Sequence, residues 1–191
     1  CLTLFYDKTL VDRAPRTTDE LVAMSKAVRA KDPEAWGVAW ELDSLFFHAP
    51  WVHGFGGSIY ANQDDDTLAI DSAAVGASLA FVRRLSVDEK IIPEEATSAL
   101  ITTLFKKHKL AFTVNGPWFM GELKGHSGWG IAPLPVVSET GERARPFLGV
   151  EGVMLSAHAP RKARAWALAK FLSADSEALP RLTAGRQLVA N

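Results

Sequence analysis

The sequence predicts an α/β fold. Short apolar runs typical of strands alternate with amphipathic helical stretches along the 191 residues. Apolar residues make up 48% of the chain and charged residues 23%, as in ordinary globular proteins, which excludes a disordered or collagen-like chain. The length suits one large or two small domains. No internal repeat or low-complexity segment is present.

In the first half, each expected helix has a recognisable start or stop signal. Thr17 and Glu20 have capping-box spacing at the start of one helix, and Gly56 and Gly57 end another. The polar run over 62–67 predicts the tip of a hairpin. The expected elements, in order, are a strand over 2–6, a helix over 17–31, a strand over 36–40, a helix over 44–55, a hairpin over 59–70 and a helix capped by Asp71 or Ser72.

In the second half, proline residues mark several boundaries. Pro93 is expected to begin a helical segment that reaches Phe105, and Pro160 to begin a later helix. A tight turn over 115–117 leads into a short helix from Trp118. The other expected elements are strands over 110–114, 129–134 and 148–156, a polar loop over 138–146 and a final helix from Asp175.

The charge balance argues against several classes of partner. Lys and Arg number 21 and Asp and Glu 22, which gives a formal net charge of −1. Nucleic-acid binding normally needs a basic surplus, so no nucleic-acid partner is expected. The longest uncharged stretch, 44–63, contains histidine, proline and glycine, so the chain is not expected to span a membrane. The single cysteine, Cys1, excludes an internal disulfide, and the absence of an initial Met predicts a longer gene product.

No catalytic or metal-binding motif is apparent. Ser127 lies in a run that lacks the final glycine of a nucleophile elbow. On a helix, His48 and His53 would point about 140° apart, which is unsuited to a shared metal. The acidic run 64–66 lacks the alternating ligands of a calcium loop, and the basic run 106–109 complements a helix dipole. We therefore expect no enzyme activity, no metal and no cofactor.

Several short motifs appear in an order that resembles one protein family. The strongest is Asn-Gly-Pro-Trp over 115–118, and the run Leu-Phe-Tyr-Asp-Lys over 4–8 is another. The other matches are 15–21, Gly56-Gly57, 71–74, 105–112, 131–135 and 149–153. Together they resemble extracellular solute-binding proteins of ABC sugar importers, most closely the maltose- and maltodextrin-binding proteins.

The resemblance implies a periplasmic-binding-protein-like, two-lobed (type II) fold that is incomplete in this chain. Residues 1–8 would be a segment crossing between lobes, 9–146 most of the second lobe, and 147–191 a crossing strand with part of the first lobe. The implied function is to bind an oligosaccharide such as maltodextrin between the lobes and to deliver it to the permease subunits of an ABC transporter. The implied location is periplasmic or extracellular, associated with the membrane through the transporter or an anchor. Because Cys1 resembles an interior strand position, a lipoprotein anchor there is disfavoured.

Trp118 is the first expected ligand-binding residue. It follows a tight turn at the end of a strand, which is where sites lie in α/β proteins. The resemblance implies an aromatic ring that stacks on a sugar at this position, because sugar rings have apolar faces as well as hydroxyl groups. The alternative is a core tryptophan.

Two positions before Gly56 depart from the family pattern. Phe46 falls where the maltodextrin binders carry a stacking tyrosine, and Ser44 where they carry a glutamate. Both changes remove hydrogen-bonding capacity toward sugar hydroxyls. Asp43 is expected either to replace the lost carboxylate or to cap the following helix.

Three more residues complete the expected set. Trp51 and Trp40 would either extend an aromatic wall or be buried behind the helix. Glu151, in the expected crossing strand, would touch the cleft or the hinge.

Two other functions remain compatible with the sequence. A polyol- or glycerol-phosphate-binding protein of the same fold would need a cationic cluster in the cleft. A solute-sensing module attached to a permease or a larger membrane protein would depend more on a partner protein than on a sugar.

Overall fold

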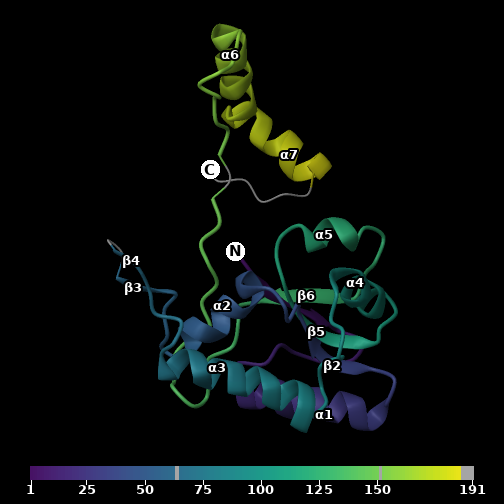
Figure 1. Ribbon diagram of the computed structural model, residues 1–191. Helices are drawn as coiled ribbons and strands as arrows, with labels where there is room; N and C mark the ends of the chain where they lie inside the picture. Colours follow the sequence, from purple (N-terminus) through teal and green to yellow (C-terminus); the bar gives the residue numbers. More distant parts are fainter. Residues whose placement is uncertain (63–64, 151, 186–191) are drawn as a thin grey trace.

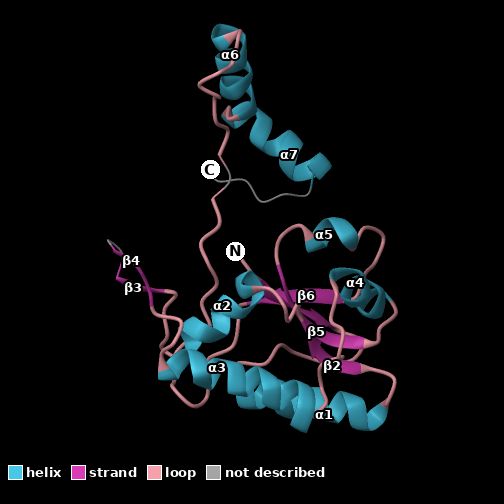
Figure 2. Ribbon diagram, viewed as in Figure 1, coloured by secondary structure: helices cyan, strands magenta, loops and turns pink. Residues whose placement is uncertain are grey.

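The computed structural model describes residues 1–62, 65–150 and 152–185, and its elements confirm the α/β class (Figures 1 and 2). In this part of the chain, four strands form a mixed sheet in the order β2-β5-β1-β6. Strand β2 is parallel to β5, whereas β1 is antiparallel to both of its neighbours. The strands are β1 (Thr3–Asp7), β2 (Trp36–Ala39), β5 (Leu110–Asn115) and β6 (Trp129–Ala132), and a separate hairpin pairs β3 (Tyr60–Asn62) with β4 (Asp65–Leu68).

The helices α1 and α3 lie on one side of the sheet, and α4 and α5 lie on the other (Figure 1). A π-helical turn, Arg84–Asp88, extends α3, and a 3-10 turn, Asp175–Glu177, precedes α7. The α-helices are α1 (Thr18–Lys31), α2 (Leu45–Gly54), α3 (Ala73–Arg83), α4 (Ser98–Lys106), α5 (Phe119–Glu122), α6 (Lys162–Leu172) and α7 (Ala178–Gly185).

The core lies on both faces of the two inner strands. All six residues of β5 are buried, and its sequence is nearly continuously apolar, as expected of a strand covered on both sides. Leu4 and Phe5 are neighbours on β1, so they point to opposite faces, and neither is exposed. Phe5 meets Phe119 of α5 edge-on, with ring centroids 5.1 Å apart. These contacts fix the ends of the strands, from which the functional side chains extend.

The predicted helix caps are mostly confirmed. The Thr17 hydroxyl accepts a hydrogen bond from the backbone N–H of Glu20, so α1 begins as expected. The Glu20 carboxylate, however, accepts from the N–H of Arg16 and from the Arg13 guanidinium, so the capping box is not reciprocal. Ser72, and not Asp71, caps α3.

Two expected elements differ from the structure. Helix α4 begins only at Ser98, because Thr97 caps it and the residues after Pro93 form turns instead. The strand expected over 148–156 is wrong for the described residues of that segment, which are extended, exposed and unpaired. Leu148 is 81% exposed and Met154 91%, so apolar character alone did not produce a strand here. A strand requires a neighbouring strand to satisfy its backbone hydrogen bonds.

The last two helices, α6 and α7, form a unit apart from the main body, which we call the helical hairpin. Figure 1 shows α6 and α7 in yellow, joined to the main body by an extended green segment. Where that segment leaves the body it passes the start of β1, since a Cβ atom on Gly149 would lie 3.9 Å from the backbone nitrogen of the exposed Cys1. Several large apolar side chains of the hairpin are exposed: Trp166, Leu168, Phe171, Leu172, Leu179 and Leu182.

Within the described residues, no helix combines the length and the apolar character that crossing a membrane would require.

Candidate functional site: an aromatic row on one side of the main body

The turn after β5 presents Trp118 at the surface. The Asn115 side-chain oxygen accepts a hydrogen bond from the N–H of Gly116 at 2.9 Å, and the carbonyl of Gly116 accepts from the N–H of Phe119 at 3.0 Å, which starts α5. Trp118 is 47% exposed. Its ring folds back over Gly116, where an added Cβ would lie 2.2 Å from two ring carbons. The glycine therefore makes room for this ring position.

Three rings from distant parts of the chain form an aromatic row: Trp118, Phe46 and Phe147. The Phe46 ring centroid lies 6.1 Å from that of Trp118 and 6.3 Å from that of Phe147, with interplanar angles of 39° and 35°. Phe47 meets Trp118 edge-on, with centroids 6.5 Å apart, and it is buried beneath the row. The sequence predicted Trp118 and Phe46 as site residues, and the structure brings them together. The third ring, Phe147, was not predicted from the sequence.

The segment that carries Phe147 is fastened to α2. His53, in the last turn of α2, hydrogen-bonds through Nδ1 to the carbonyl oxygen of Arg145 at 2.6 Å. The His53 ring also meets Phe147 edge-on, with centroids 5.6 Å apart. Phe147 packs against the small apolar cluster of Val52, Ile59 and Val75. The third ring of the row is therefore held by both polar and apolar contacts.

The opposite face of α2 is buried. The Trp51 ring lies 5.0 Å from Trp40 and 5.4 Å from Phe81, and neither tryptophan is exposed. The sequence left two alternatives for Trp40 and Trp51, an aromatic wall or burial behind the helix. The structure shows burial for both. Neither contributes a surface to the aromatic row.

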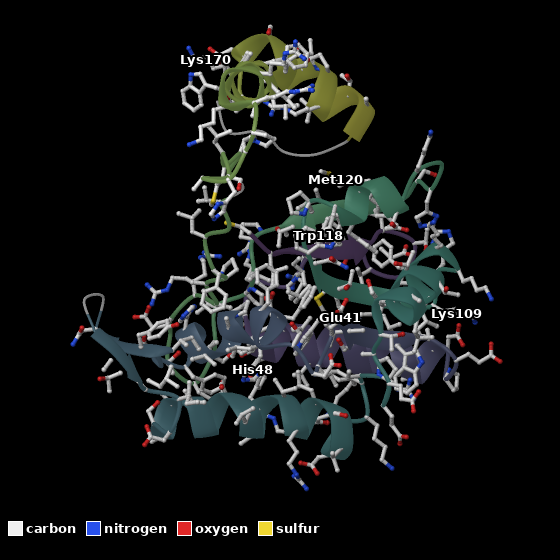
Figure 3. All side chains as sticks on the ribbon, turned by 45° about the horizontal axis from the view of Figure 1, so that its top comes forward. Glu41, His48, Lys109, Trp118, Met120 and Lys170 are labelled. Atoms are coloured by element: carbon white, nitrogen blue, oxygen red, sulfur yellow. The ribbon has the colours of Figure 1, made fainter. Side chains whose placement is uncertain are left out.

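Beneath α2, a buried histidine joins two helices. The Nε2 atom of His48 lies 3.0 Å from the Ser78 hydroxyl of α3, which also donates to the carbonyl of Val75. Burial lowers the pKa of His48 below its ordinary value, because the charged imidazolium loses its hydration there. A neutral His48 thus holds α2 against α3. Figure 3 shows Trp118 and Met120 on the side of the body that faces the hairpin carrying Lys170, with His48 on the far side.

Carboxylates gather before the start of α2. Ser44 is the N-cap residue of α2 but its side chain makes no capping hydrogen bond, and Asp43, one position earlier, is exposed. Asp43 is therefore not the N-cap residue. Instead it lines a groove of about 400 Å³ whose described lining contains no Lys, Arg or His. The lining residues are Glu41, Leu42, Asp43, Glu94, Glu95, Ala96, Thr97 and Ser98. Glu151 lies outside the described residues.

This arrangement suits a ligand that has both apolar faces and hydroxyl groups. A row of partly exposed rings can cover apolar C–H surface, and an exposed carboxylate such as that of Asp43 can accept hydrogen bonds from hydroxyls. Phe46 and Asp43 are only three positions apart in the sequence, on either side of the start of α2.

Known proteins resemble this chain over nearly its whole length. The family model of bacterial extracellular solute-binding proteins matches residues 1–188. A maltotriose-binding protein of Pyrococcus abyssi is 27% identical over 187 residues, which cover 95% of this chain and 40% of that protein.

Solved structures agree with the sequence match. The maltose/maltodextrin-binding domain of Bdellovibrio bacteriovorus bound to maltotriose is 30% identical, with a TM-score of 0.83 over 91% of this chain and 47% of that one. A maltotriose-binding protein of Thermus thermophilus bound with maltotriose is 28% identical, with a TM-score of 0.78 over 90% of this chain and 47% of that one. The chain thus spans about half the length of these relatives, and its fold is an incomplete form of the two-lobed periplasmic-binding-protein fold. On these grounds the chain belongs to the family of bacterial extracellular solute-binding proteins.

Proposed function

We propose that the protein containing this chain binds a malto-oligosaccharide between two lobes and delivers it to the permease subunits of an ABC transporter. The observation that carries this proposal is the aromatic row, in which two rings predicted from the sequence and a third lie 6.1 and 6.3 Å apart. The names of the relatives, which bind maltotriose or maltodextrin, support the ligand class. In this proposal the protein is not an enzyme and works in the periplasm or outside the cell.

The proposed lobes follow the boundaries expected from the sequence. Residues 1–8 are a crossing segment, 9–146 most of the second lobe, and 147–191 a crossing segment with part of the first lobe. The exposed, extended course of the residues after Phe147 supports a crossing there. Ligand that binds the closed arrangement more tightly than the open one would drive closure by that difference in affinity.

Each site residue has a proposed role. Trp118 stacks on one sugar ring, and Phe46 and Phe147 extend the apolar surface to its neighbours. Phe46 has no hydroxyl group, so Asp43 and Ser44 supply the hydrogen bonds on this side. Glu151 remains a predicted cleft residue from its position in the crossing segment.

A phosphate-bearing ligand is less well supported. A glycerol-phosphate binder would need cations beside the aromatic row. The groove that Asp43 lines has carboxylates from Glu41, Asp43, Glu94 and Glu95 in its described lining, which would repel a phosphate. The other alternative is a solute-sensing module attached to a permease or a larger membrane protein. The sequence of the complete gene would distinguish it from a separate binding protein, because a permease or membrane domain would then be encoded in the same chain.

The test is isothermal titration calorimetry of the full-length protein and of this chain with maltotriose, maltotetraose and a panel of other sugars. We expect micromolar affinity for the full-length protein, about −8 kcal/mol. Trp118→Ala is expected to weaken binding by about 30-fold or more, because it removes a central aromatic contact. The control is Tyr60→Ala on β3, whose ring is similarly exposed (51%) but lies outside the aromatic row.

A folded full-length protein that binds no sugar of the panel would contradict the proposal. So would equal affinity of wild type and Trp118→Ala. Absence of binding by the chain alone is expected if half of the cleft lies outside it.

A further inference from the structure

A second cluster of side chains lies at the end of the sheet opposite to the aromatic row. Asp7 is the last residue of β1, His108 lies just before β5, and His126 lies shortly before β6. Because β5 and β6 run antiparallel to β1, their starts meet the end of β1. Trp118 follows the other end of β5, where Asn115 pairs with Thr3. Thr3 and Asp7 are four positions apart on β1, so the two ends of the sheet lie about 13 Å apart along this strand.

Two of the three residues form a close pair around a buried charge. Asp7 is fully buried, and its Oδ2 atom accepts a hydrogen bond from Nδ1 of His108 at 2.7 Å. Its other oxygen, Oδ1, accepts from the N–H and the hydroxyl of Thr9 at 2.8 and 2.6 Å. Thr9 thus holds the carboxylate in place through one oxygen and leaves the other directed toward the histidines.

His126 completes the cluster with an atom that has no partner. Its ring lies 4.8 Å from that of His108, centroid to centroid. Its Nε2 atom is buried and has no hydrogen-bond partner among the described residues, which is costly for a polar atom. One ligand atom from each of the three residues lies within 4.8 Å of the others.

We propose that Asp7, His108 and His126 bind a divalent transition-metal ion, with Zn²⁺ the best match. Two imidazoles and one carboxylate are typical ligands of Zn²⁺, whereas Ca²⁺ and Mg²⁺ prefer oxygen ligands alone. The His108 side chain is 42% exposed, so an ion bound there can be reached from solvent, and water would supply the fourth ligand.

Small movements bring the three atoms to metal-binding distances. Tetrahedral Zn²⁺ with bonds of about 2.0–2.1 Å places its ligand atoms about 3.3 Å apart. When the ion binds, the proton of His108 must move from Nδ1 to Nε2 by exchange with solvent, which frees the Nδ1 lone pair for the metal. The contact between Asp7 and His108 must then lengthen by about half an ångström, and the widest separation must close by about 1.5 Å at most. His126 lies in a loop between Gly125 and Gly128, which both have positive φ, and His108 itself has φ of 55°. This loop and the partly exposed His108 side chain allow such adjustment.

The neighbouring lysines do not occupy the site. Lys109, which is labelled in Figure 3 and precedes β5, points its ammonium group to Asp32 at 2.7 Å and to Glu34 at 3.2 Å. Its charge is thereby compensated by carboxylates outside the cluster. Lys106, at the end of α4, is exposed to solvent, which screens its repulsion of a cation.

The experiment is calorimetric titration of the chelator-treated chain with ZnCl₂. We expect one Zn²⁺ per chain in wild type, and binding at least tenfold weaker in both His108→Ala and His126→Ala. Asp7→Asn, which keeps the oxygen that Thr9 uses, is expected to show the same loss. The control is His158→Ala, because this exposed histidine lies in the segment leading to α6. Bound Co²⁺ is expected to show visible absorption in wild type and to lose it in the two cluster variants.

A folded wild-type chain without saturable Zn²⁺ binding would overturn the proposal. Zn²⁺ affinity unchanged in both histidine variants would also overturn it, because the ion would then bind elsewhere. Far-ultraviolet circular dichroism of each variant shows that it is folded. Zn²⁺ is also expected to raise the Tm of wild type but not that of His108→Ala, because only a folded site with all three ligands gains from the ion.

Discussion

At the scale of single residues, the position of one ring depends on the lack of a side chain beside it. Trp118 folds back over Gly116, and the backbone around the turn is held by hydrogen bonds of Asn115 and Phe119. The three atoms nearest to such a Cβ all belong to the far end of the Trp118 ring. A side chain at Gly116 would therefore move the ring without undoing the turn.

Gly116→Ala is accordingly expected to separate binding from stability. The Trp118 ring must leave its position over Gly116, which changes its place in the aromatic row, so we expect sugar affinity of the full-length protein to fall by about tenfold or more. The free energy of unfolding should change by less than about 1 kcal/mol. Calorimetry and denaturant unfolding measure the two quantities.

Gly121→Ala provides the control for this prediction. Gly121 belongs to α5, close to the turn, but a Cβ there would meet no atom within 4 Å. It should leave affinity unchanged. If Gly116→Ala bound sugar like wild type, either the ring position or its role in binding would be wrong.

At the scale of elements, local signals predicted more than long-range contacts did. The starts of α1 and α3 could be predicted because Thr17 and Ser72 cap them within three residues of chain. Strand β5 could be predicted because a strand buried on both faces is continuously apolar. The segment 148–156 was mispredicted because whether a strand forms depends on a partner elsewhere.

The same distinction applies to the sites. Trp118 stood out because it ends the Asn-Gly-Pro-Trp motif, and Phe46 because of its distance from Gly56-Gly57, although their contact joins positions 72 apart in the chain. Phe147 has no such motif, and only its packing against α2 reveals it. The cluster of Asp7, His108 and His126 arises from the antiparallel pairing of three strands, so no local spacing indicates it.

The contact between α2 and α3 makes stability depend on pH. His48 is buried with a lowered pKa, so the unfolded chain takes up a proton at higher pH than the folded chain does. Stability is therefore fully present above the unfolded pKa of about 6.5 and is lost as pH falls toward the folded pKa. His48→Gln, which can still hydrogen-bond to Ser78, should reduce this loss.

The measurement is the free energy of unfolding by urea at pH 7.5, 6.5, 5.5 and 5.0. Some dependence on pH should remain in His48→Gln, because burial also lowers the pKa of His126. The same substitution at the exposed His158 serves as control. Equal slopes for wild type and His48→Gln would show that His48 does not contribute to the pH dependence.

At the scale of the whole molecule, the chain consists of a packed body and a helical hairpin with an exposed apolar surface. Trp166, Leu168 and Phe171 of α6 are each more than half exposed, although such side chains are usually covered. The relatives are about twice as long as this chain, so the proposed two-lobed protein has further residues available to cover them.

Removal of the hairpin is therefore expected to leave the body intact. A chain of residues 1–158 should unfold cooperatively within a few degrees of the Tm of the whole chain, because the core of the body does not include α6 or α7. It should also remain monomeric at concentrations at which the whole chain associates through its apolar surface. Calorimetric unfolding and light scattering test both points. A noncooperative or strongly lowered transition would mean that the hairpin supports the body.

The closeness of Cys1 and Gly149 has a practical use. Cys1 is exposed and is the only thiol of this chain, so a fluorophore can be attached at this one position. The dye would then lie beside the extended segment that leaves the body for the hairpin. In the proposed two-lobed protein, both of these segments cross between the lobes. A label at Cys1 would thus turn the approach of one lobe to the other into a change of emission, and the protein into an optical sensor for its own sugar.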